Sequence, residues 1–421
     1  HPAPGRRRAR AAVTAGAASA GRAVTGTAAG TTLTGAELAA TIAGALDLEV
    51  SEAGVRPWRL PPAARRYAPS ALALMAEFCA GVHLRMLTAA PTITLEVTVT
   101  RLQQRGASAA PAVAPFVAVV DGRPADRVDV DEGALVREHD DRSLHREGGA
   151  RSAVVLRLAE ATTAAPRLVE VWLPADAGVF LHSVSAASAL LPAPVDERPR
   201  WLHYGSSISH GGSAGTPLGT WPRLAAARLG VAGVNLGFGG NALLDPAVAR
   251  ALAAEPAAAI TLEVGINVVG ADAMRERVFV PVLHGFLDTL REGHPTTPIG
   301  VITAFACPAV ETTPGPIRAA ADGRATGTPR EVRPGDGTLT LARTRALIEQ
   351  VVARRAPSDP ALHLIDGLSL LGTDEHQHLP DGLHPDPAGH ALIATRFAAQ
   401  ASAGGAASGA GRVFAGQRLA P

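Results

Sequence analysis

Five residues in four separated segments of the chain could together attack an acyl ester. Ser207 follows a strand-like apolar run, and Asp381 and His384 lie three residues apart near the carboxyl end. A serine hydroxyl becomes a nucleophile at neutral pH only when an imidazole accepts its proton and a carboxylate holds that imidazole in one tautomer. Gly240 and Asn267 lie between these segments and could donate hydrogen bonds to the oxygen that becomes negative during attack. The four segments therefore predict nucleophilic acyl chemistry.

The order of these residues resembles the SGNH or GDSL superfamily of serine esterases and acyltransferases, which is named for Ser, Gly, Asn and His in four blocks. The resemblance implies that Ser207 is the nucleophile and that Asp381 and His384 complete a catalytic triad. It also implies an oxyanion hole formed by Ser207, Gly240 and Asn267. No metal and no organic cofactor is implied by this mechanism.

Two positions depart from the pattern of that superfamily. Ser206 stands where the family usually has Asp, and Val268 follows Asn267 at a position where the family commonly has Asp. Neither position is expected to do chemistry. The first departure leaves neighbouring serines, Ser209 and Ser213, as alternative nucleophiles that labelling must distinguish from Ser207.

The residues of the four blocks require a scaffold that brings them together. After residue 197, short apolar runs alternate with helical patterns, which predicts a parallel sheet with helices on both faces, an α/β/α arrangement that is flavodoxin-like. The block residues fall just past the carboxyl ends of the first three strands, where open α/β sheets place their ligands. The expected strands are 201–205, 231–236, 258–264, 299–305 and 362–366.

Two apolar stripes with helical period support this arrangement. One stripe is Val282, Leu283, Phe286, Leu287 and Leu290, and the other is Leu341, Thr344, Leu347, Ile348, Val351 and Val352. At the final block, Asp386 and Pro387 are suited to cap and to start the last helix. The stripes indicate core packing, and the cap fixes the turn that carries His384.

The amino-terminal half has a different pattern, with period-two alternation over residues 93–100 and turn-rich connections. It predicts a β-sandwich, which is jelly-roll-like by the resemblance, over residues 33–196. Thr34 and Glu37 have the spacing of a capping box, so a short helix through Leu38, Ile42 and Leu46 is expected to open it. The further strands expected there are 116–120, 154–158 and 168–173.

The domain organisation follows from these patterns. A Pro-rich linker over residues 191–199 separates the β-sandwich from an α/β catalytic domain over residues 197–400. Residues 1–32 and 401–421 are expected to be flexible tails. The Pro- and Gly-rich insertion 306–338 is longer than ordinary connections, and it is expected to form a lid or a pocket wall.

Composition excludes several classes of partner. The formal net charge of the 421-residue chain is +1 and it contains no lysine, so neither a nucleic acid nor a membrane surface is an expected partner. Cys79 and Cys307 are expected to be free thiols. There is no signal-peptide pattern after the basic run at Arg6, and there is no apolar stretch of transmembrane length. The sequence does not determine the cellular compartment, and the cytoplasm is slightly favoured.

Three rival motifs leave the other blocks unexplained. The segment 211–215 imitates the nucleophile elbow of α/β-hydrolases, but no strand directly precedes it. The glycines at 237–239 with Glu263 imitate a dinucleotide fingerprint. Asp374, Glu375, His376 and His378 could bind a metal ion, but a solvated polar loop explains them better, and no metal site is expected.

The expected reaction is hydrolysis of a small O-acyl ester, with a small molecule or a carbohydrate as substrate. The amino-terminal domain makes the chain resemble the GDSL branch that includes carbohydrate acetyl esterases and antibiotic-tailoring acyltransferases. Transfer from an acyl thioester donor to a hydroxyl is therefore the alternative, and a carbohydrate-binding module with a decayed catalytic half is a third. His210, Trp221, Asn241 and Phe305 are the candidate substrate contacts.

Overall fold

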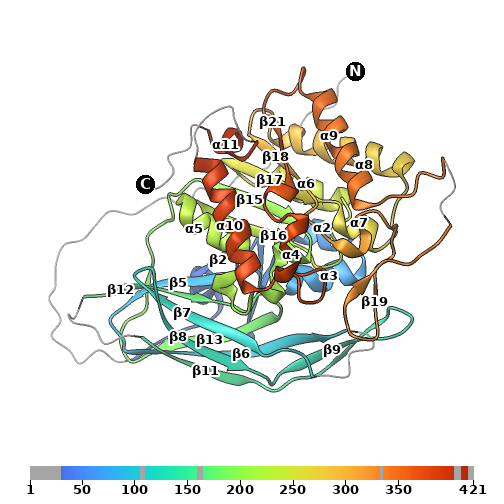
Figure 1. Cartoon of the computed structure of the whole chain (residues 1–421). Coiled ribbons are helices and arrows are strands. Elements are labelled where there is room, and N and C mark those ends of the chain that lie inside the picture. Colours follow the sequence, from blue (N-terminus) through green and yellow to red (C-terminus); the bar gives the residue numbers. More distant parts are fainter. Residues whose placement is uncertain (1–29, 105–109, 159–164, 332–334, 403–408, 416–421) are drawn as a thin grey trace, which may run out of the picture.

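The computed structural model describes residues 30–104, 110–158, 165–331, 335–402 and 409–415 (Figure 1). Most of the expected amino-terminal tail lies outside the described residues. The short strand β1 (Thr31–Leu33) nevertheless pairs with β13 (Gly178–Ala186). Regular structure therefore begins before the helix that was expected to open the fold.

A five-stranded parallel sheet forms the centre of the carboxyl-terminal part, in the order β16-β15-β17-β18-β21. The α/β class and all five expected strands are confirmed. The strands are β15 (Arg200–Gly205), β16 (Ala232–Gly237), β17 (Ala259–Val264), β18 (Ile299–Thr303) and β21 (Leu362–Ile365). The chain builds β16 on one side of β15 and β17 on the other. The topological switch point, where such sheets bind ligands, is thus at the carboxyl end of β15.

Helices cover both faces of this sheet. One face packs against α5 (Trp221–Leu229), α10 (Pro387–Ser402) and α11 (Gly409–Val413), and the other against α6 (Pro246–Ala254), α8 (Glu276–Gly293) and α9 (Leu341–Arg355). Three of these helices have a proline at their first or second position, where the missing N–H leaves no hydrogen bond unmade. Both expected apolar stripes are confirmed, since they face the core from α8 and α9.

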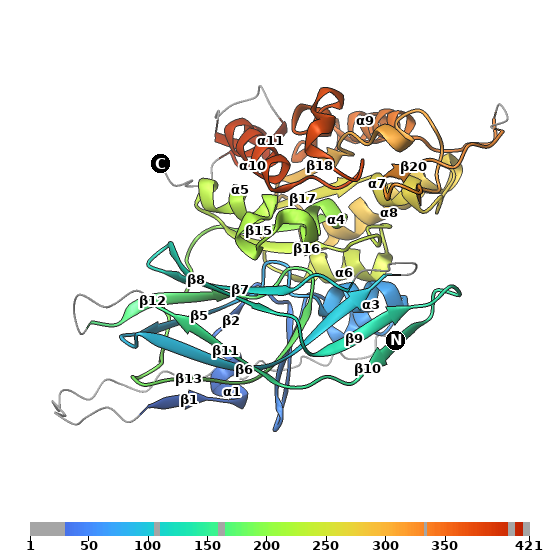
Figure 2. The ribbon, with the colours of Figure 1, turned by 60° about the horizontal axis from the view of Figure 1, so that its bottom comes forward.

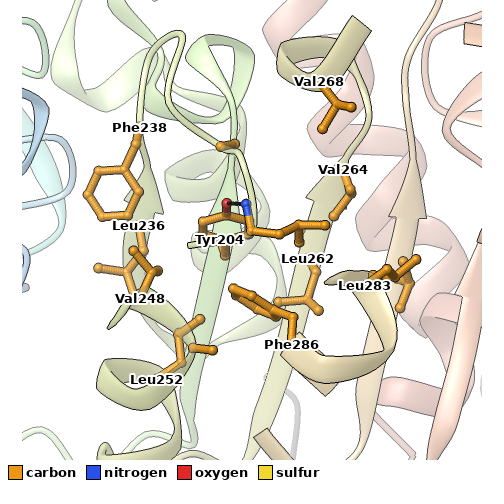
Figure 3. Close-up of a cluster of buried hydrophobic side chains, with 14 of the residues drawn as sticks. Tyr204, Leu236, Phe238, Val248, Leu252, Leu262, Val264, Val268, Leu283 and Phe286 are labelled. Carbon is orange, nitrogen blue, oxygen red and sulfur yellow. Dashed lines mark hydrogen bonds between the residues drawn. The ribbon is translucent and has the colours of Figure 1, made fainter. Parts of the chain in front are cut away.

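Figure 3 shows the core between the sheet and the helices α6 and α8. Tyr204 of β15 lies at its centre, between Leu236 of β16 and Phe286 of α8. The Leu244 N–H donates to the Tyr204 hydroxyl oxygen at 2.9 Å, so the one polar atom of this ring is satisfied. Burial raises the pKa of Tyr204 far above its ordinary value. The strand that precedes the candidate nucleophile is therefore fixed by close packing.

The expected carboxyl-terminal tail is partly wrong. α10 continues to Ser402, and α11 packs on the sheet through Ala410, Val413 and Phe414, all of which are buried. The error has a simple cause, because residues 401–415 are rich in Ala and Gly and carry little periodic signal. Residues 403–408 and 416–421 lie outside the described residues.

Two mainly antiparallel sheets form the amino-terminal part. The larger sheet contains β1, β13, β3 (Asp47–Ser51), β4 (Gly54–Trp58), β6 (Thr92–Gln103), β9 (Ala134–Glu138), β10 (Leu144–Glu147) and β11 (Ser152–Arg157). The smaller sheet contains β2 (Ile42–Ala43), β5 (His83–Thr88), β7 (Ala114–Val120), β8 (Arg123–Val130), β12 (Arg167–Trp172) and β14 (Leu191–Pro192). All four expected strands of this half are confirmed, as β6, β7, β11 and β12.

The alternation of side chains explains how the two sheets pack. On β6, Ile93, Leu95, Val97 and Val99 face a hydrophobic core shared by both sheets. On β7, Phe116 and Ala118 join the same core, whereas Val117 and Val119 face the opposite way and contact Leu218 of the α/β part. Figure 2 shows the two sheets stacked beneath the α/β part, with the sheet of β5, β7 and β12 nearer to it.

Two details of the amino-terminal expectation are wrong. The opening helix α1 (Gly35–Ala39) spans only five residues and Thr34 makes no side-chain cap, because Ile42 and Ala43 pair with β5 instead of continuing the helix. The expected linker is also shorter than residues 191–199, since Leu191 and Pro192 pair with β5 as β14. A pairing partner far along the sequence overrides the local signal in both cases.

One hydrophobic cluster, distinct from the core between the two sheets, contains residues of both parts of the chain. α2 (Pro62–Arg65) and α3 (Ser70–Glu77) bury Ala64, Leu72 and Met75 in the same cluster as the residues around Tyr204. The buried Arg59 reinforces this contact, since its guanidinium donates to the Gly237 carbonyl oxygen at the end of β16. The strand-rich part is thereby fixed against β16, the edge strand next to β15, and β15 leads into Ser207.

Candidate active site

Ser207 lies in the turn between β15 and α4 (Ser207–His210), at the carboxyl edge of the parallel sheet. Ser206 caps this short helix, because its hydroxyl oxygen accepts from the Ile208 N–H at 3.2 Å. The residue that departs from the family pattern thus keeps the capping function that an aspartate would have. Ser207 itself is half-buried, so its hydroxyl is accessible from the sheet edge.

The structure brings Ser207, His384 and Asp381 into one hydrogen-bonded line. The Ser207 Oγ lies 2.9 Å from the His384 Nε2, and the His384 Nδ1 lies 2.7 Å from the Asp381 Oδ2. The other carboxylate oxygen, Oδ1, accepts from the backbone N–H groups of Leu383 and His384 at 2.9 and 2.7 Å. With Nδ1 donating to the carboxylate, Nε2 is left to accept the Ser207 proton.

The environment keeps Asp381 ionised. Partial burial opposes the charge, but the hydrogen bonds from the His384 ring and backbone outweigh it and lower the pKa of Asp381 to about 2. About a third of the His384 side chain is exposed. The predicted cap behind this turn is confirmed, since the Asp386 Oδ1 accepts from the Gly389 N–H at 2.7 Å at the start of α10. The imidazole is therefore held in a fixed tautomer but remains reachable.

Two other serines contact histidines, but neither has the same arrangement. The Ser209 Oγ lies 2.7 Å from the His203 Nε2, and the His203 Nδ1 lies 2.7 Å from the Thr261 hydroxyl oxygen, which bears no charge. Both Ser209 and His203 are buried, and burial lowers the pKa of His203 to about 3. This pair belongs to the core beneath the site.

Ser213 is the second alternative. Its hydroxyl donates to the Pro385 carbonyl oxygen at 2.7 Å and lies 3.2 Å from the His390 Nε2. The His390 Nδ1 accepts from the Trp221 N–H at 3.3 Å, and burial lowers the pKa of His390 to about 4. Among the three serine and histidine pairs, that of Ser207 alone has a carboxylate on the second ring nitrogen and accessible surface.

Three potential donors at the expected oxyanion positions have no hydrogen-bond partner within the described residues. They are the backbone N–H groups of Ser207 and Gly240 and the side-chain amide nitrogen of Asn267. The Asn267 Oδ1 accepts from the Ala242 N–H at 2.9 Å, which orients its Nδ2 as a donor. Gly240 has a φ of +69°, in the left-handed region that glycine adopts without strain. The loop that carries it packs closely beside Ser207, with 3.7 Å between the Ser207 Cβ and an added Gly239 Cβ.

A buried carboxylate supports the turn from below. Glu263 of β17 is fully buried, and its Oε2 accepts from the Ser206 N–H at 2.7 Å and from the Ser209 hydroxyl at 3.3 Å. Its Oε1 has no hydrogen-bond partner among the residues that the structure describes. Burial is the main cause that raises the pKa of Glu263 above its usual 4.5, although these hydrogen bonds oppose the rise.

This raised pKa predicts a pH-dependent gain in stability for Glu263→Gln. Above pH 4.5 the unfolded chain loses the Glu263 proton while the folded chain retains it, so folding becomes less favourable as the pH rises. The Gln variant lacks this linkage. Urea denaturation at pH 4 and at pH 8 should therefore show the free energy of unfolding of the variant gaining on that of the parent at the higher pH. A difference that stays constant across this range would contradict the assignment.

Three of the four expected substrate contacts are core residues instead. His210, Trp221 and Phe305 have at most 2% of their surface exposed. The rings of Trp221 and Phe305 pack edge to face at 6.2 Å within the core beneath α5 and α10. The expectation for these three residues is wrong, because α4 and α5 turn His210 and Trp221 into the core and the segment after β18 does the same with Phe305. Asn241 stays near the site, where its amide donates to the Gly239 carbonyl oxygen at 2.6 Å.

His210 joins the two parts of the chain. Its Nδ1 lies 3.1 Å from the Arg59 guanidinium, and its Nε2 lies 2.8 Å from the Ala175 carbonyl oxygen. With Arg59 donating to Nδ1, the Nε2–H donates to Ala175, and the ring is neutral. Burial first, and then the charge of Arg59, lower the pKa of His210 to about 3.

The long insertion forms one wall of the site. Its hairpin of β19 (Arg318–Ala319) and β20 (Ala325–Thr326) contacts the turn of the triad, where the Ala325 N–H donates to the Asp381 carbonyl oxygen at 2.6 Å. A cavity of about 340 Å³ lies between the hairpin and the triad. It is lined by Ser213, Asp322, Gly323, Arg324, Pro380, Asp381 and His384.

The described residues contain neither a metal-binding cluster nor a membrane-spanning helix. In that part of the chain, no group of three or more acidic, histidine or cysteine side chains is arranged to hold a metal ion. Glu375 pairs instead with Arg396, and His378 lies 3.3 Å from Asp386. Of the helices described, none has the length and apolarity needed to cross a membrane. Cys79 and Cys307 are both buried and free, as expected.

Comparison with family models identifies the class of the α/β part. Residues 203–392 match the GDSL-like lipase/acylhydrolase family, and the matched stretch includes Ser207, Gly240, Asn267 and His384. The α/β part of the chain is thus similar to this family over the matched residues, and the match supports an enzyme of the esterase and acyltransferase class. A search of curated protein sequences gives no match.

Solved structures share the fold of both parts. The salicylyl-acyltransferase SsfX3 from a tetracycline biosynthetic pathway is 24% identical with a TM-score of 0.71, over 87% of this chain and 95% of that chain. A GDSL-like protein from Bacteroides ovatus ATCC 8483 is 22% identical with a TM-score of 0.64, over 89% and 97%. A family two carbohydrate esterase from Clostridium thermocellum is 14% identical with a TM-score of 0.51, over 76% and 91%. At these identities the likeness concerns the fold.

Two supporting residues, Glu263 and Arg59, were not expected from the sequence, and only the first of them carries a signal there. Glu263 interrupts the otherwise uncharged run of β17, and such a carboxylate in a central strand is a sign of a buried polar function. Nothing in the sequence marks Arg59, which lies more than a hundred residues from the carbonyl oxygens that it contacts in β16.

Proposed function

We propose that this enzyme cleaves a small O-acyl group from an ester through a covalent acyl-enzyme on Ser207. The observation that carries the proposal is the hydrogen-bonded line from Ser207 through His384 to Asp381, with distances of 2.9 and 2.7 Å. These distances are within the range for proton transfer between a nucleophile and its base. The ionised Asp381 also stabilises the imidazolium that forms when His384 takes the proton.

The reaction proceeds in two steps, formation of the acyl-enzyme and its hydrolysis. The Ser207 oxygen attacks the ester carbonyl as His384 Nε2 takes its proton, and the carbonyl oxygen becomes negative. His384 then returns the proton to the departing alcohol as the carbon–oxygen bond breaks, which leaves the acyl group on Ser207. In the second half, water gives its proton to His384 and attacks the acyl carbon, and the Ser207 oxygen leaves with that proton.

The oxyanion formed in each half needs donors, and we assign them to Ser207, Gly240 and Asn267. Their N–H groups have no other partner within the described residues. The fixed orientation of the Asn267 amide favours this role, since a preorganised donor costs no reorganisation during the reaction. The small cavity beside Asp381 and His384 favours a small acyl group or a small alcohol.

Asn267→Ala should lower kcat by about 10²- to 10³-fold and leave KM nearly unchanged, because the lost hydrogen bond acts mainly in the transition state. Steady-state kinetics with p-nitrophenyl acetate measures both constants. Asn267→Asp is the matched control, since its carboxylate still accepts from the Ala242 N–H but cannot donate. A recovered kcat in the Asp variant would show that residue 267 only holds the loop.

Transfer to an alcohol instead of water is the second candidate. The strand-rich part contributes to the surroundings of the nucleophile turn, where Met75 contacts the loop at Gly239, and Asp176 contacts Gly212. Such a surface could hold an acceptor, and the structurally similar SsfX3 is a salicylyl-acyltransferase. In this second candidate, an acyl thioester is the donor and a hydroxyl of a small-molecule or glycosylated natural product is the acceptor.

Product analysis separates the two candidates. The enzyme is incubated with an acetyl thioester and with a series of alcohols, and the free acid and the new ester are quantified together. Hydrolysis that is unaffected by any alcohol supports the esterase. An ester product that grows with alcohol concentration at the expense of the acid supports transfer.

We also propose a division of the chain into two domains. We take residues 33–196 as a jelly-roll-like β-sandwich, with the boundary near residue 197, just before β15 begins at Arg200. The two stacked sheets and their shared core support the β-sandwich. The inclusion of α2 and α3 in the core of the α/β part means that the two domains fold against each other.

A further inference from the structure

A second cavity lies between the two parts of the chain, away from Ser207. It has a volume of about 390 Å³, within the range of small-molecule sites. Its walls come from β2, β5 and β12 of the strand-rich part and from α5 and the first halves of β15 and β16. Figure 2 shows these elements facing one another across the boundary. Trp201 and His203 of β15 line the cavity, whereas Ser207, Asp381 and His384 do not.

One wall of this cavity is flat and carries a cation. The Trp172 indole stacks on the His83 ring, with 4.1 Å between centroids and 12° between planes. The Arg223 guanidinium of α5 lies 5.3 Å from the Trp172 ring centroid, from the other part of the chain. A planar ligand could stack in this region, because aromatic rings and guanidinium groups both offer flat surfaces.

The charges around the cavity leave one cation without an ionic partner. Arg198 hydrogen-bonds Asp196 through two nitrogens, at 2.8 and 2.5 Å. Arg200 lies 2.8 Å from Glu255, and the Glu170 carboxylate lies 3.5 Å from the guanidinium of Arg85. These pairs neutralise both acidic side chains of the lining.

Arg223, in contrast, makes no hydrogen bond and no ion pair within the described residues. Burial is the main cause that lowers its pKa, and the more distant Glu170 opposes that effect. A partly desolvated charge without a partner is unfavourable, so a ligand with one negative charge would be stabilised there.

We propose that this cavity binds a small aromatic carboxylate, with the carboxylate on Arg223 and the ring beside Trp172. The volume, the flat wall and the single unpaired cation each support this class of ligand. The ligand would contact both parts of the chain and would occupy a site separate from the acyl-enzyme site. The proposal does not depend on the reaction at Ser207.

Calorimetric titration with 1-naphthoate tests the proposal, with the uncharged 1-naphthamide as matched ligand. The protein is first treated with a small organofluorophosphonate, so that the nucleophile site is occupied. We expect 1-naphthoate to bind at one site per chain and at least ten-fold more tightly than 1-naphthamide. Absence of saturable binding of 1-naphthoate, or equal affinity for the two ligands, would overturn the proposal. Both measurements use the parent protein, so they do not depend on the folding of a variant.

Variants then locate the binding. Arg223→Met should weaken binding of 1-naphthoate at least ten-fold, whereas Arg228→Met, which removes an exposed arginine from the same helix, should leave the affinity unchanged. Thermal melting verifies that each variant is folded. An unaltered affinity in Arg223→Met would overturn the assigned site. If the nucleophile proves unreactive, the same titrations without the phosphonate test the cavity, so failure of the proposed function is distinguished from failure of this inference.

Discussion

Ser207→Ala is expected to lower kcat for p-nitrophenyl acetate by about 10⁶-fold, to the level left by binding and oxyanion stabilisation alone. The reason is geometric. Within the described residues, the Ser207 hydroxyl is the one that meets a histidine whose second ring nitrogen lies against a carboxylate. The variant should melt near the temperature of the parent, because Ser207 is half-buried and, within the described part of the chain, its hydroxyl hydrogen-bonds to His384 alone.

The matched controls are Ser213→Ala and Ser209→Ala, which remove the two other serines that contact a histidine. Both should keep covalent labelling by an organofluorophosphonate. Ser209→Ala should lose some stability, because the Ser209 hydroxyl bridges the buried His203 and Glu263. Loss of labelling in either control with retention in Ser207→Ala would reverse the assignment of the nucleophile.

Asp381→Asn is expected to lower kcat by about 10⁴-fold with little change in KM. The asparagine oxygen can still accept from the Leu383 and His384 N–H groups, so the turn should keep its shape. Its amide nitrogen would instead face the His384 Nδ1 and favour the tautomer with the proton on Nε2. That tautomer cannot accept the Ser207 proton.

Steady-state kinetics and a crystal structure of the Asp381→Asn variant test this expectation together. An unchanged turn with a greatly reduced kcat supports the tautomer argument. A kcat within ten-fold of the parent value would mean that the carboxylate is dispensable, and the proposed triad would then be reduced to Ser207 and His384.

Most of the α/β architecture could be predicted from the sequence because its signals are local. The strands of the parallel sheet are short apolar runs, and the helices α8 and α9 have clear apolar stripes. The meeting of Ser207 with His384, 177 residues away, could be expected because both follow strands whose carboxyl ends lie at one sheet edge. The resemblance to a known family then gave each residue a role.

The errors concern contacts that no local signal records. Trp221 and Phe305 follow strand ends as the block residues do, but the direction of each side chain depends on how the following helix or loop turns. The helix α1 ends early because Ile42 and Ala43 pair with β5, more than forty residues downstream. In the same way, Arg59 binds the end of β16 through a contact between the two parts of the chain.

The contact between the two parts suggests why they are joined in one chain. Arg59 donates to the Gly237 carbonyl oxygen, and the His210 ring links α4 to Ala175 in the strand-rich part. The segment that carries Ser207 is therefore held from below by Glu263 and from the side by the strand-rich part. A nucleophile turn fixed in this way needs little reorganisation before attack.

The most direct measurement is the site of the acyl-enzyme itself. The enzyme is mixed with p-nitrophenyl acetate, quenched in acid within the first turnover, digested and mapped by mass spectrometry. The proposed mechanism predicts acetyl on Ser207, and none in the Ser207→Ala variant. Acetyl on a different residue during turnover, or rapid turnover without any covalent adduct, would contradict it.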